Sequence, residues 1–340
     1  MEGRDVAVVI LNWNGAELLS RFLPSVVEHT PAWVDIYIAD NGSTDGSLAT
    51  IEGRVKTIQL DRNYGFAGGY NLALAQLKHH YFILLNSDVE VTAGWCEPLI
   101  ERLEGGVGAV APKILSAVDR SRFDYAGAAG GMIDYLGYPY CRGRILSRVE
   151  RDRGQYDGGG DIFWASGAAF GCRSELFHSL GGFDSDFFAH QEEIDLCWRM
   201  QLAGYRVVVE PRSVVYHLGG ATLESGSAKK IYLNHRNNLI MLVKCASWGQ
   251  LIAVALLRPS LDIMAAISYL LKGRADQFAA VFRAWGSTIR MLPSSLKKRS
   301  SICREAKPRG IYRGSLFWLA WQGSKGKDMP CNSYCNEDKK

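Results

Sequence analysis

The sequence predicts an α/β fold with a mostly parallel central sheet, followed by a helical region at the C-terminal end. In the first 110 residues, short apolar runs alternate with stretches of helical periodicity. Apolar runs linked by crossover helices are typical of buried parallel strands. Beyond Lys229 the periodicity is helical throughout. A Rossmann-like nucleotide fold is therefore the natural expectation for the first part of the chain.

The expected elements follow in order along the chain. The strands of the first part are expected at 6–11, 34–40, 55–60, 81–86 and 107–112, with helices at 17–28 and 66–78. Residues 113–160 are rich in Gly, Tyr and Arg, which indicates hairpins or loops covering a site. The remaining expectations are a strand at 161–173, a short helix from Ser174, a helix opening on the acids at 192–195, and strands at 205–211 and 213–220.

Charge divides the chain into two parts. The net charge of +4 combines 22 Lys+Arg against 29 Asp+Glu in residues 1–243, which is −7, with 17 against 6 in residues 244–340, which is +11. We therefore expect an α/β domain over 1–243, a basic amphipathic helical region that associates with membrane over 244–325, and a disordered tail over 326–340.

The basic region is expected to bind an anionic membrane surface rather than nucleic acid. Its apolar segments 251–257 and 261–271 are too short to span a bilayer and are interrupted by Arg258 and Pro259. Aromatic and aliphatic residues that alternate with Arg and Lys are typical of helices in a membrane interface. The alternative is a helical cap packed on the catalytic domain, and the two are compatible.

Cysteine usage and the N-terminus indicate the cytoplasm. The eight cysteines form no CxxC pair and no zinc-finger spacing with histidine, so neither a disulfide framework nor a structural zinc is indicated. The apolar run before Asn12 is too short for a signal peptide. We expect a cytoplasmic protein that lies peripherally on the inner face of the cytoplasmic membrane.

Polar residues follow the expected strands at the sheet edge where α/β proteins bind ligands. Asp40 ends the second strand and precedes a turn rich in Gly, Ser and Asn, where a carboxylate can accept a hydrogen bond from a pyrimidine base or a ribose. The alternative is an Asx-turn and helix N-cap. The stretch "NYGFAGGYN" (63–71) is a glycine-rich helix start that can bring backbone close to a diphosphate.

A third strand, "YFILLN", ends in Asn86, Ser87 and Asp88. One carboxylate with phosphate oxygens and water is a typical set of ligands for Mg²⁺ or Mn²⁺. Asp88 is therefore expected to bind a metal that carries a diphosphate. A turn-capping aspartate is the alternative.

At this point the sequence resembles the family 2 glycosyltransferases with a GT-A fold, and within them the bacterial rhamnosyltransferase-like branch. The resemblance covers residues 6 to about 243. It is carried by five ordered blocks and the histidine segment behind them: "VVILNWNG", "IADNGSTDGS", "NYGFAGGYN", "LLNSDVEV", "FFAHQEEIDLCWR" and "VVYHLGG".

The resemblance implies roles for individual residues. Asp40 resembles the acid that recognises the uracil or thymine base, and Asp88 the metal-binding acid that ends the DxD motif, whose first acid is Asn86 here. His217 matches a histidine that completes the metal or diphosphate site in some members. A further set is expected to contact the nucleotide: Asn12, Asn41, Gly42, Asn63, Gly65, Gly68 and Ser87, with Arg236 as a clamp on the diphosphate.

The acids of "HQEEIDLCWR" are the expected catalytic centre. Glu193 resembles the family's catalytic base, supported by Glu192 and Asp195. The alternative is a surface helix whose dipole favours acids in its first turn. With the base, the resemblance implies an inverting transfer of a sugar, with rhamnose favoured, from a dTDP- or UDP-sugar to a hydroxyl of a glycan or a polyprenyl-diphosphate-linked saccharide. The rival function is a catalytically weak nucleotide-sugar-binding protein or scaffold.

Overall fold

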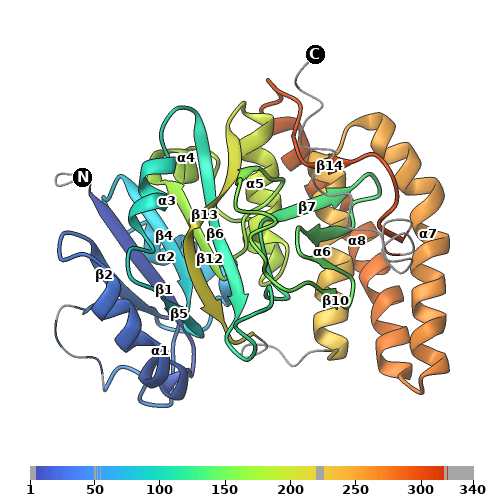
Figure 1. Cartoon of the computed structure of the whole chain (residues 1–340). Coiled ribbons are helices and arrows are strands. Elements are labelled where there is room, and N and C mark those ends of the chain that lie inside the picture. Colours follow the sequence, from blue (N-terminus) through green and yellow to red (C-terminus); the bar gives the residue numbers. More distant parts are fainter. Residues whose placement is uncertain are drawn as a thin grey trace.

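The computed structural model describes residues 5–49, 51, 53, 55–219, 226–317 and 320, and it has the expected α/β fold with a helical C-terminal region (Figure 1). The expected tail at 326–340 lies outside the described residues, as do Cys331 and Cys335. The six described cysteines are free thiols, in agreement with the sequence.

The central sheet of the described chain has nine strands in the order β11-β13-β6-β12-β4-β1-β2-β3, with β5 paired to β13. Its strands are β1 Val6–Asn12, β2 Asp35–Asp40, β3 Val55–Gln59, β4 Tyr81–Asn86, β5 Val89–Val91, β6 Val107–Ser116, β11 Gly160–Asp161, β12 Ala169–Arg173 and β13 Arg206–His217. Strands β3, β2, β1 and β4 are parallel, and so are β6 and β13. The antiparallel strand β12 joins the two blocks.

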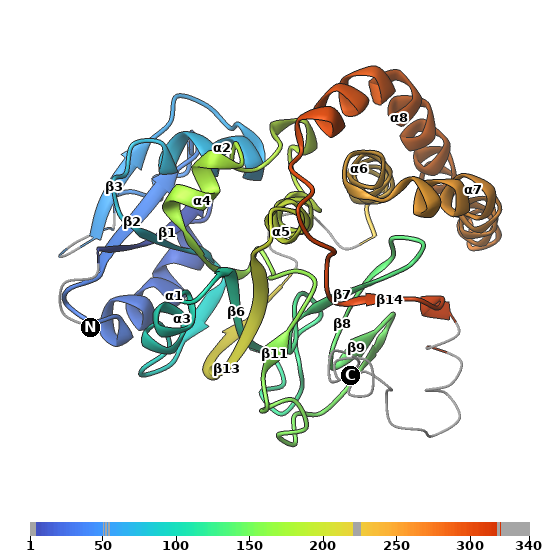
Figure 2. The same ribbon diagram turned by 90° about the horizontal axis from the view of Figure 1, so that it is seen from above.

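Helices cover both faces of this sheet (Figure 2). On one face, α1 (Ala16–His29) and α3 (Glu97–Arg102) pack through Leu19, Val26 and Leu99 against one set of strand residues. On the other face lie α2 (Gly65–Leu74), α4 (Ser174–Ser179) and α5 (Glu192–Leu202). Because the central strands β1 and β4 are covered on both faces, they carry the near-continuous apolar runs seen in the sequence.

A second sheet forms within the stretch where hairpins were expected. It contains β7 Gly131–Asp134, β8 Pro139–Cys141, β9 Arg144–Ile145 and β10 Arg148–Val149. Its last strand, β14 (Ile311–Tyr312), comes from the far end of the chain and pairs in parallel with β7. The C-terminal region is therefore built into the fold of the first part.

Two expectations about strands were wrong. Residues 161–173 form β11 and β12 rather than one strand, because the chain crosses between them from one edge of the sheet to its centre. Conversely, the two strands expected at 205–211 and 213–220 are one strand, β13, whose pairing with β6 shifts register between Glu210 and Val214. A β-bulge of this kind bends a strand without ending it.

Three helices follow: α6 Ala228–Cys245, α7 Trp248–Leu271 and α8 Ala275–Ser301, with the short 3₁₀ helix η1 (Ser185–Phe187) preceding α5. The expectation of two short apolar segments was wrong, since α7 runs without a break through Arg258 and Pro259. Within the described residues, α7 is the one helix long and apolar enough to cross a membrane. Helix α8 packs along α6 and α7, and its Lys298 pairs with Asp184 of the first part, which is the packing expected of a helical cap.

Candidate active site

The polar ends of β1 and β2 meet at the carboxyl edge of the sheet. Asn12 Nδ2 donates to Asp40 Oδ1 at 3.1 Å and to Ser43 Oγ at 3.1 Å, and the Ser43 amide donates to the second oxygen of Asp40. Both Asn12 and Asp40 are buried, but Asn12 Oδ1 has no protein partner. This buried acceptor faces the edge at which a nucleotide is expected, and it is available to a ligand donor.

Asn41 and Asn63 hold the glycine-rich start of α2. Asn41 Nδ2 donates to Asn63 Oδ1 and to the Gly65 carbonyl, while the Tyr64 amide donates to Asn41 Oδ1 at 3.0 Å. The Gly65 amide donates to Asn63 Oδ1 at 2.8 Å. The two asparagines thus connect the end of β2 with the helix N-terminus, where backbone amides favour anions.

Two glycines of this region are required by close packing. A Cβ atom at Gly42, where φ is +74°, would lie 2.5 Å from Arg62 Cα. A Cβ atom at Gly65, also at φ +74°, would lie 2.5 Å from the Phe188 carbonyl oxygen. Gly68 is less restricted, with a Cβ contact of 3.0 Å to Tyr64. The first two positions therefore need both the left-handed backbone and the absent side chain.

Strand β4 delivers Asn86, Ser87 and Asp88 to the same edge, and Asp88 meets His217 from the end of β13. Asp88 Oδ1 lies 3.3 Å from His217 Nε2, and the other ring nitrogen, Nδ1, lies 3.0 Å from Asp124 Oδ2. All three side chains are buried. Ser87 lies near Asn12, because both approach the position that a Cβ atom of Gly15 would occupy.

The two carboxylates determine the charge of this histidine. Burial by itself would lower the pKa of His217, but hydrogen bonds to Asp124 and Asp88 raise it to about 10. Burial also opposes ionisation of Asp88, yet the hydrogen bond from His217 lowers the pKa of Asp88 below its usual value. Without other ligands, the group is therefore an imidazolium held between two carboxylates.

The expected base, Glu193, lies at the start of α5 beside Glu192. Glu193 is partly exposed whereas Glu192 is buried, and one carboxylate oxygen of each has no hydrogen-bond partner. Burial raises the pKa of Glu193 to about 7. Burial and the neighbouring charge of Glu193 raise the pKa of Glu192 further above its usual value. Burial therefore favours the protonated form of Glu192, and the pKa of Glu193 lies near neutral pH.

The segment between β11 and β12 connects the base to the Asp88 end of the site. The Glu193 carboxyl carbon lies 4.0 Å from the position of a Gly167 Cβ atom, and the Asn86 amide donates to the carbonyl of the next residue, Ala168. Ser166 Oγ in turn donates to the carbonyl of Ala126, two residues after Asp124. Glu193, Asp88 and His217 consequently border one region of the sheet edge.

The loop that precedes Glu193 is strained and is fastened by α6. Phe188, His190 and Gln191 all have positive φ, at 64°, 71° and 74°. Asn237 Nδ2 donates to the carbonyls of Phe187, Ala189 and His190. Arg236, expected as a diphosphate clamp, donates through Nη2 to the carbonyls of Asp186 and Phe187. Strain of this kind persists only where the surroundings impose it, often at functional sites.

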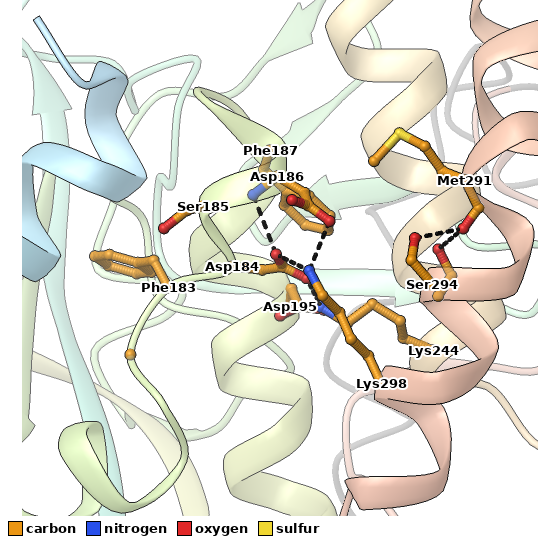
Figure 3. Close-up of polar contacts among 12 residues, drawn as sticks. Phe183, Asp184, Ser185, Asp186, Phe187, Asp195, Lys244, Met291, Ser294 and Lys298 are labelled. Carbon is orange, nitrogen blue, oxygen red and sulfur yellow. Dashed lines mark hydrogen bonds and ion pairs between the residues drawn. The ribbon is translucent and has the colours of Figure 1, made fainter.

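Asp195 lies on the opposite side of α5 in a buried ionic cluster (Figure 3). It pairs with Arg199 at 2.8 Å and with Lys244 of α6 at 2.7 Å. Lys244 and Lys298 of α8 both bind Asp184 at 2.5 Å, and Lys298 also binds Asp186 at 2.7 Å. Burial opposes ionisation of Asp184, but the two lysines lower its pKa to about 2. Through these ion pairs, α5, α6 and α8 are connected to the loop that precedes Glu193.

Sequence reasoning missed Asp124 and Asn237. Asp124 lies in the Gly- and Tyr-rich stretch that has no periodicity, so nothing in the sequence marked it as a partner of His217. Asn237 stands directly beside Arg236 in "NHRNNL". The available signal was this run of polar residues in a helical stretch, and the structure shows that Asn237 is buried.

Solved structures with the same arrangement are GT-A glycosyltransferases. S. aureus TarS (residues 1–349) aligns with a TM-score of 0.55 at 14% identity, covering 87% of this chain and 83% of that one. GalNAc-T7, solved with UDP, GalNAc and Mn²⁺, aligns with a TM-score of 0.54 at 19% identity, covering 72% of this chain and 48% of that one. The chain therefore has the GT-A fold.

The sequence comparisons identify the family. The pattern described as "Glycosyl transferase family 2" matches residues 7–181, and the chain belongs to this family. A Mycobacterium tuberculosis (strain CDC 1551 / Oshkosh) protein, N-acetylglucosaminyl-diphospho-decaprenol L-rhamnosyltransferase, is 27% identical over 69% of this chain and 83% of its own length. The pre-mycofactocin glycosyltransferase of the same strain is 27% identical over 67% of this chain and 46% of its own length. The chain is a hexosyltransferase with rhamnosyltransferase-like sequence.

Proposed function

We propose that this enzyme transfers a sugar from a dTDP- or UDP-sugar to a hydroxyl of a glycan or lipid-linked saccharide, with inversion at the sugar C1. Rhamnose is the favoured sugar. The observation that carries the proposal is the Glu193 carboxylate, which has a pKa near neutrality and an oxygen without a protein partner. It borders the same region as Asp88 and His217. A base with this pKa is suited to take a proton from a hydroxyl at physiological pH.

In this mechanism Glu193 accepts the proton of the acceptor hydroxyl as that oxygen attacks the sugar C1. Burial and the charge of Glu193 raise the pKa of Glu192, and in its protonated form Glu192 donates a hydrogen bond that orients an acceptor oxygen or Glu193 itself. Asp40 and Asn12 supply acceptors for the base or ribose of the donor. The amides of Gly65 and Phe66 at the start of α2 already donate to Asn63 Oδ1 and to the Phe188 carbonyl, so a diphosphate there would meet the positive end of the helix dipole rather than free amides.

Asp88 and His217 would hold a divalent cation, Mg²⁺ or Mn²⁺, together with the diphosphate. Among the described residues no three His, Cys, Asp or Glu side chains are grouped so that they hold an ion by themselves. Asp88 Oδ1 and His217 Nε2 lie 3.3 Å apart, and His217 would give up its Nε2 proton on binding the cation, because a metal-binding imidazole must be neutral. The cation, when bound, supplies positive charge that stabilises the departing nucleoside diphosphate.

Two features favour a lipid-linked acceptor at the inner face of the cytoplasmic membrane. The M. tuberculosis relative is named for a diphospho-decaprenol acceptor. The C-terminal helices of this chain are basic and expose apolar side chains. Synthesis of cell-surface polysaccharide is the role that such an acceptor implies. The rival function, a catalytically weak nucleotide-sugar-binding scaffold, is disfavoured by the unpaired Glu193 oxygen and by the Asp88–His217 pair.

The test is direct assay of the pure protein. Incubation with dTDP-rhamnose and a panel of UDP-sugars, with a polyprenyl-diphosphate saccharide as acceptor, should give a product in which the anomeric configuration is inverted by NMR. Excess EDTA should abolish turnover, and Mn²⁺ or Mg²⁺ should restore it. Donor binding without turnover on any acceptor would favour the scaffold, and full activity in EDTA would exclude the metal. Tighter calorimetric binding of GDP than of UDP and dTDP would contradict the pyrimidine donor.

A further inference from the structure

The outer face of α7 is an exposed apolar surface that extends along the whole helix. Its members lie four, three or seven residues apart, so they fall within an arc of about 100° on a helix of 3.6 residues per turn. They are Trp248, Ile252, Leu256, Ile263, Ile267 and Leu270, and Leu256 is 74% exposed. Soluble monomers rarely expose a continuous apolar patch of this extent. In both views α7 is the element farthest from the sheet, with its outer side uncovered by any described segment (Figures 1 and 2).

Helix α8, which packs against α7, has an exposed apolar row of its own with positive charge beside it. Phe282, Ile289 and Leu296 are exposed at seven-residue spacing, and Arg283, Arg290 and Lys297 form the adjacent exposed stripe at the same spacing. Lys272 and Arg274 are exposed in the α7–α8 turn. None of these five basic side chains forms an ion pair with another described residue, and the one exposed acid of the hairpin is Asp276.

We propose that this α7–α8 face binds an anionic lipid bilayer and that α7 lies in the plane of the membrane interface. Helices with an apolar face bordered by Lys and Arg bind there by burying the apolar side chains and attracting anionic headgroups. A second copy of the chain fits the face poorly, because two such faces in contact would bring the basic stripes together.

The inner face of α7 explains why the helix lies in the interface although it is long enough to cross. Arg258 is buried, donates to the Leu136 carbonyl at 2.9 Å and to Asn238 Oδ1 at 2.8 Å, and stacks on Tyr138. Asp262 accepts from Tyr138 and from Trp285 Nε1. These two charged residues are near the middle of α7. A spanning helix would move both into the hydrocarbon and break these bonds, which is unfavourable.

A membrane bound by α7 and α8 would lie close to the edge of the sheet that carries the site. The α7–α8 turn lies at the same end of the molecule as the carboxyl ends of β1 and β6, at the bottom of Figure 1. A Cβ atom at Gly226, just before α6, would lie 3.8 Å from the Arg274 guanidinium. A saccharide on a membrane lipid would therefore be presented beside the site. This consequence rests on the proposed function, whereas bilayer binding does not.

Vesicle sedimentation with the full-length protein tests the surface. At low salt the protein should sediment with vesicles of phosphatidylglycerol and phosphatidylcholine and remain free with phosphatidylcholine alone. The double variant Leu256→Asp/Ile267→Asp should bind at least tenfold more weakly. A matched control, Val118→Asp/Leu72→Asp, changes two equally exposed apolar residues of the catalytic domain and should bind like wild type. Arg283→Gln/Arg290→Gln should also lower the affinity about tenfold, against an Arg21→Gln/Lys78→Gln control.

Three results would overturn the proposal. The first is wild-type protein that ignores anionic vesicles at low salt, and the second is equal binding by Leu256→Asp/Ile267→Asp. The third is bound protein that resists extraction by alkaline carbonate, which would show that α7 spans the bilayer. Sedimentation equilibrium without lipid tests whether the face binds a second copy of the chain instead. A wild-type dimer that the substitutions Leu256→Asp/Ile267→Asp dissociate, together with no binding to vesicles, would assign the face to a second copy. None of these readouts depends on glycosyl transfer, so failure of the proposed activity leaves this test intact.

Discussion

Asp124 holds His217 by a buried hydrogen bond of 3.0 Å from Nδ1 of the imidazole to Oδ2 of the carboxylate. The bond leaves the Nε2 atom facing Asp88. Residues that orient a metal-binding histidine through its second nitrogen typically change metal affinity by 10- to 100-fold when mutated. Asp124 is thus a positioning residue for the proposed cation site.

The first prediction concerns this residue. Asp124→Ala should weaken Mn²⁺ binding in the presence of UDP by about 10- to 100-fold, because His217 loses the partner that fixes its ring. Asp124→Asn, which can still accept a hydrogen bond through its amide oxygen, should lose less. Electron paramagnetic resonance of free Mn²⁺ gives the affinity without turnover, and Asp119→Asn is an exposed control in the same loop. Unchanged Mn²⁺ affinity in Asp124→Ala would leave the aspartate with a merely structural role.

The second prediction separates the two glutamates. Glu193→Gln keeps shape and hydrogen bonding but cannot accept the acceptor proton, so kcat should fall by about 10²- to 10⁴-fold with nucleotide binding preserved. Glu192→Gln should cost at most about tenfold, since burial and the neighbouring Glu193 raise the pKa of Glu192 and so favour the protonated form that Gln resembles. Steady-state kinetics on both variants decides the assignment. If Glu192→Gln is the inactive variant, the base is the neighbouring residue.

The third prediction is a pH profile. Glu193 must be ionised to act, and its pKa near 7 means that kcat/KM should rise about tenfold per pH unit below 7 and level off above it. Because the folded pKa exceeds the ordinary value, the stability contribution of the protonated form is complete at acid pH and is lost as pH rises through about 7. Glu193→Gln should therefore be more stable than wild type at pH 8, by about 1 to 3 kcal/mol, and equal to it near pH 4. A profile flat from pH 5 to 8 would contradict the buried base.

The fourth prediction distinguishes Asp195 from the glutamates. It is fully buried between Arg199 and Lys244, so Asp195→Ala should lower the free energy of unfolding by about 3 to 5 kcal/mol by leaving buried cations unpaired. Chemical denaturation measures this loss. The exposed pair Arg212–Glu101 offers a control, Glu101→Ala, expected to cost no more than about 1 kcal/mol. Normal stability with lost turnover in Asp195→Ala would return the residue to the catalytic group.

The sequence predicted those parts of the fold that follow from local pattern. The apolar runs of β1, β2, β3 and β4 and the amphipathic α1 were found because each forms its pattern within a few residues. The sequence did not predict that residues 161–173 form two strands or that β13 is one continuous strand. Both features depend on which strands these segments pair with across the sheet. Continuity of α7 through Pro259 was also missed, since Pro is a strong but not absolute helix breaker.

For the site, the ordered blocks predicted which side chains reach the sheet edge, and the structure places Asn12, Asp40, Asn63, Asp88, Glu193 and His217 along it. The roles of these residues remain predictions. What the sequence could not supply are partners that come from distant segments, as Asp124 does for His217 and Lys244 for Asp195. These pairs lie 93 and 49 positions apart, and no periodicity relates them.

The ion pairs of Lys298 with Asp184 and Asp186 limit which C-terminal segments of related enzymes can replace the one in this chain. A chimera that joins the α/β part at residue 243 to another protein's C-terminal module would lose Lys244, Lys298 and strand β14 together. The loop before Glu193 would then keep its strained backbone and its hydrogen bonds from Arg236 and Asn237, but it would lose the lysines that pair with Asp184 and Asp186. C-terminal helical modules are therefore expected to be exchangeable only as units that carry a matching lysine pair, and libraries of domain swaps can be screened for that property by thermal melting before any assay.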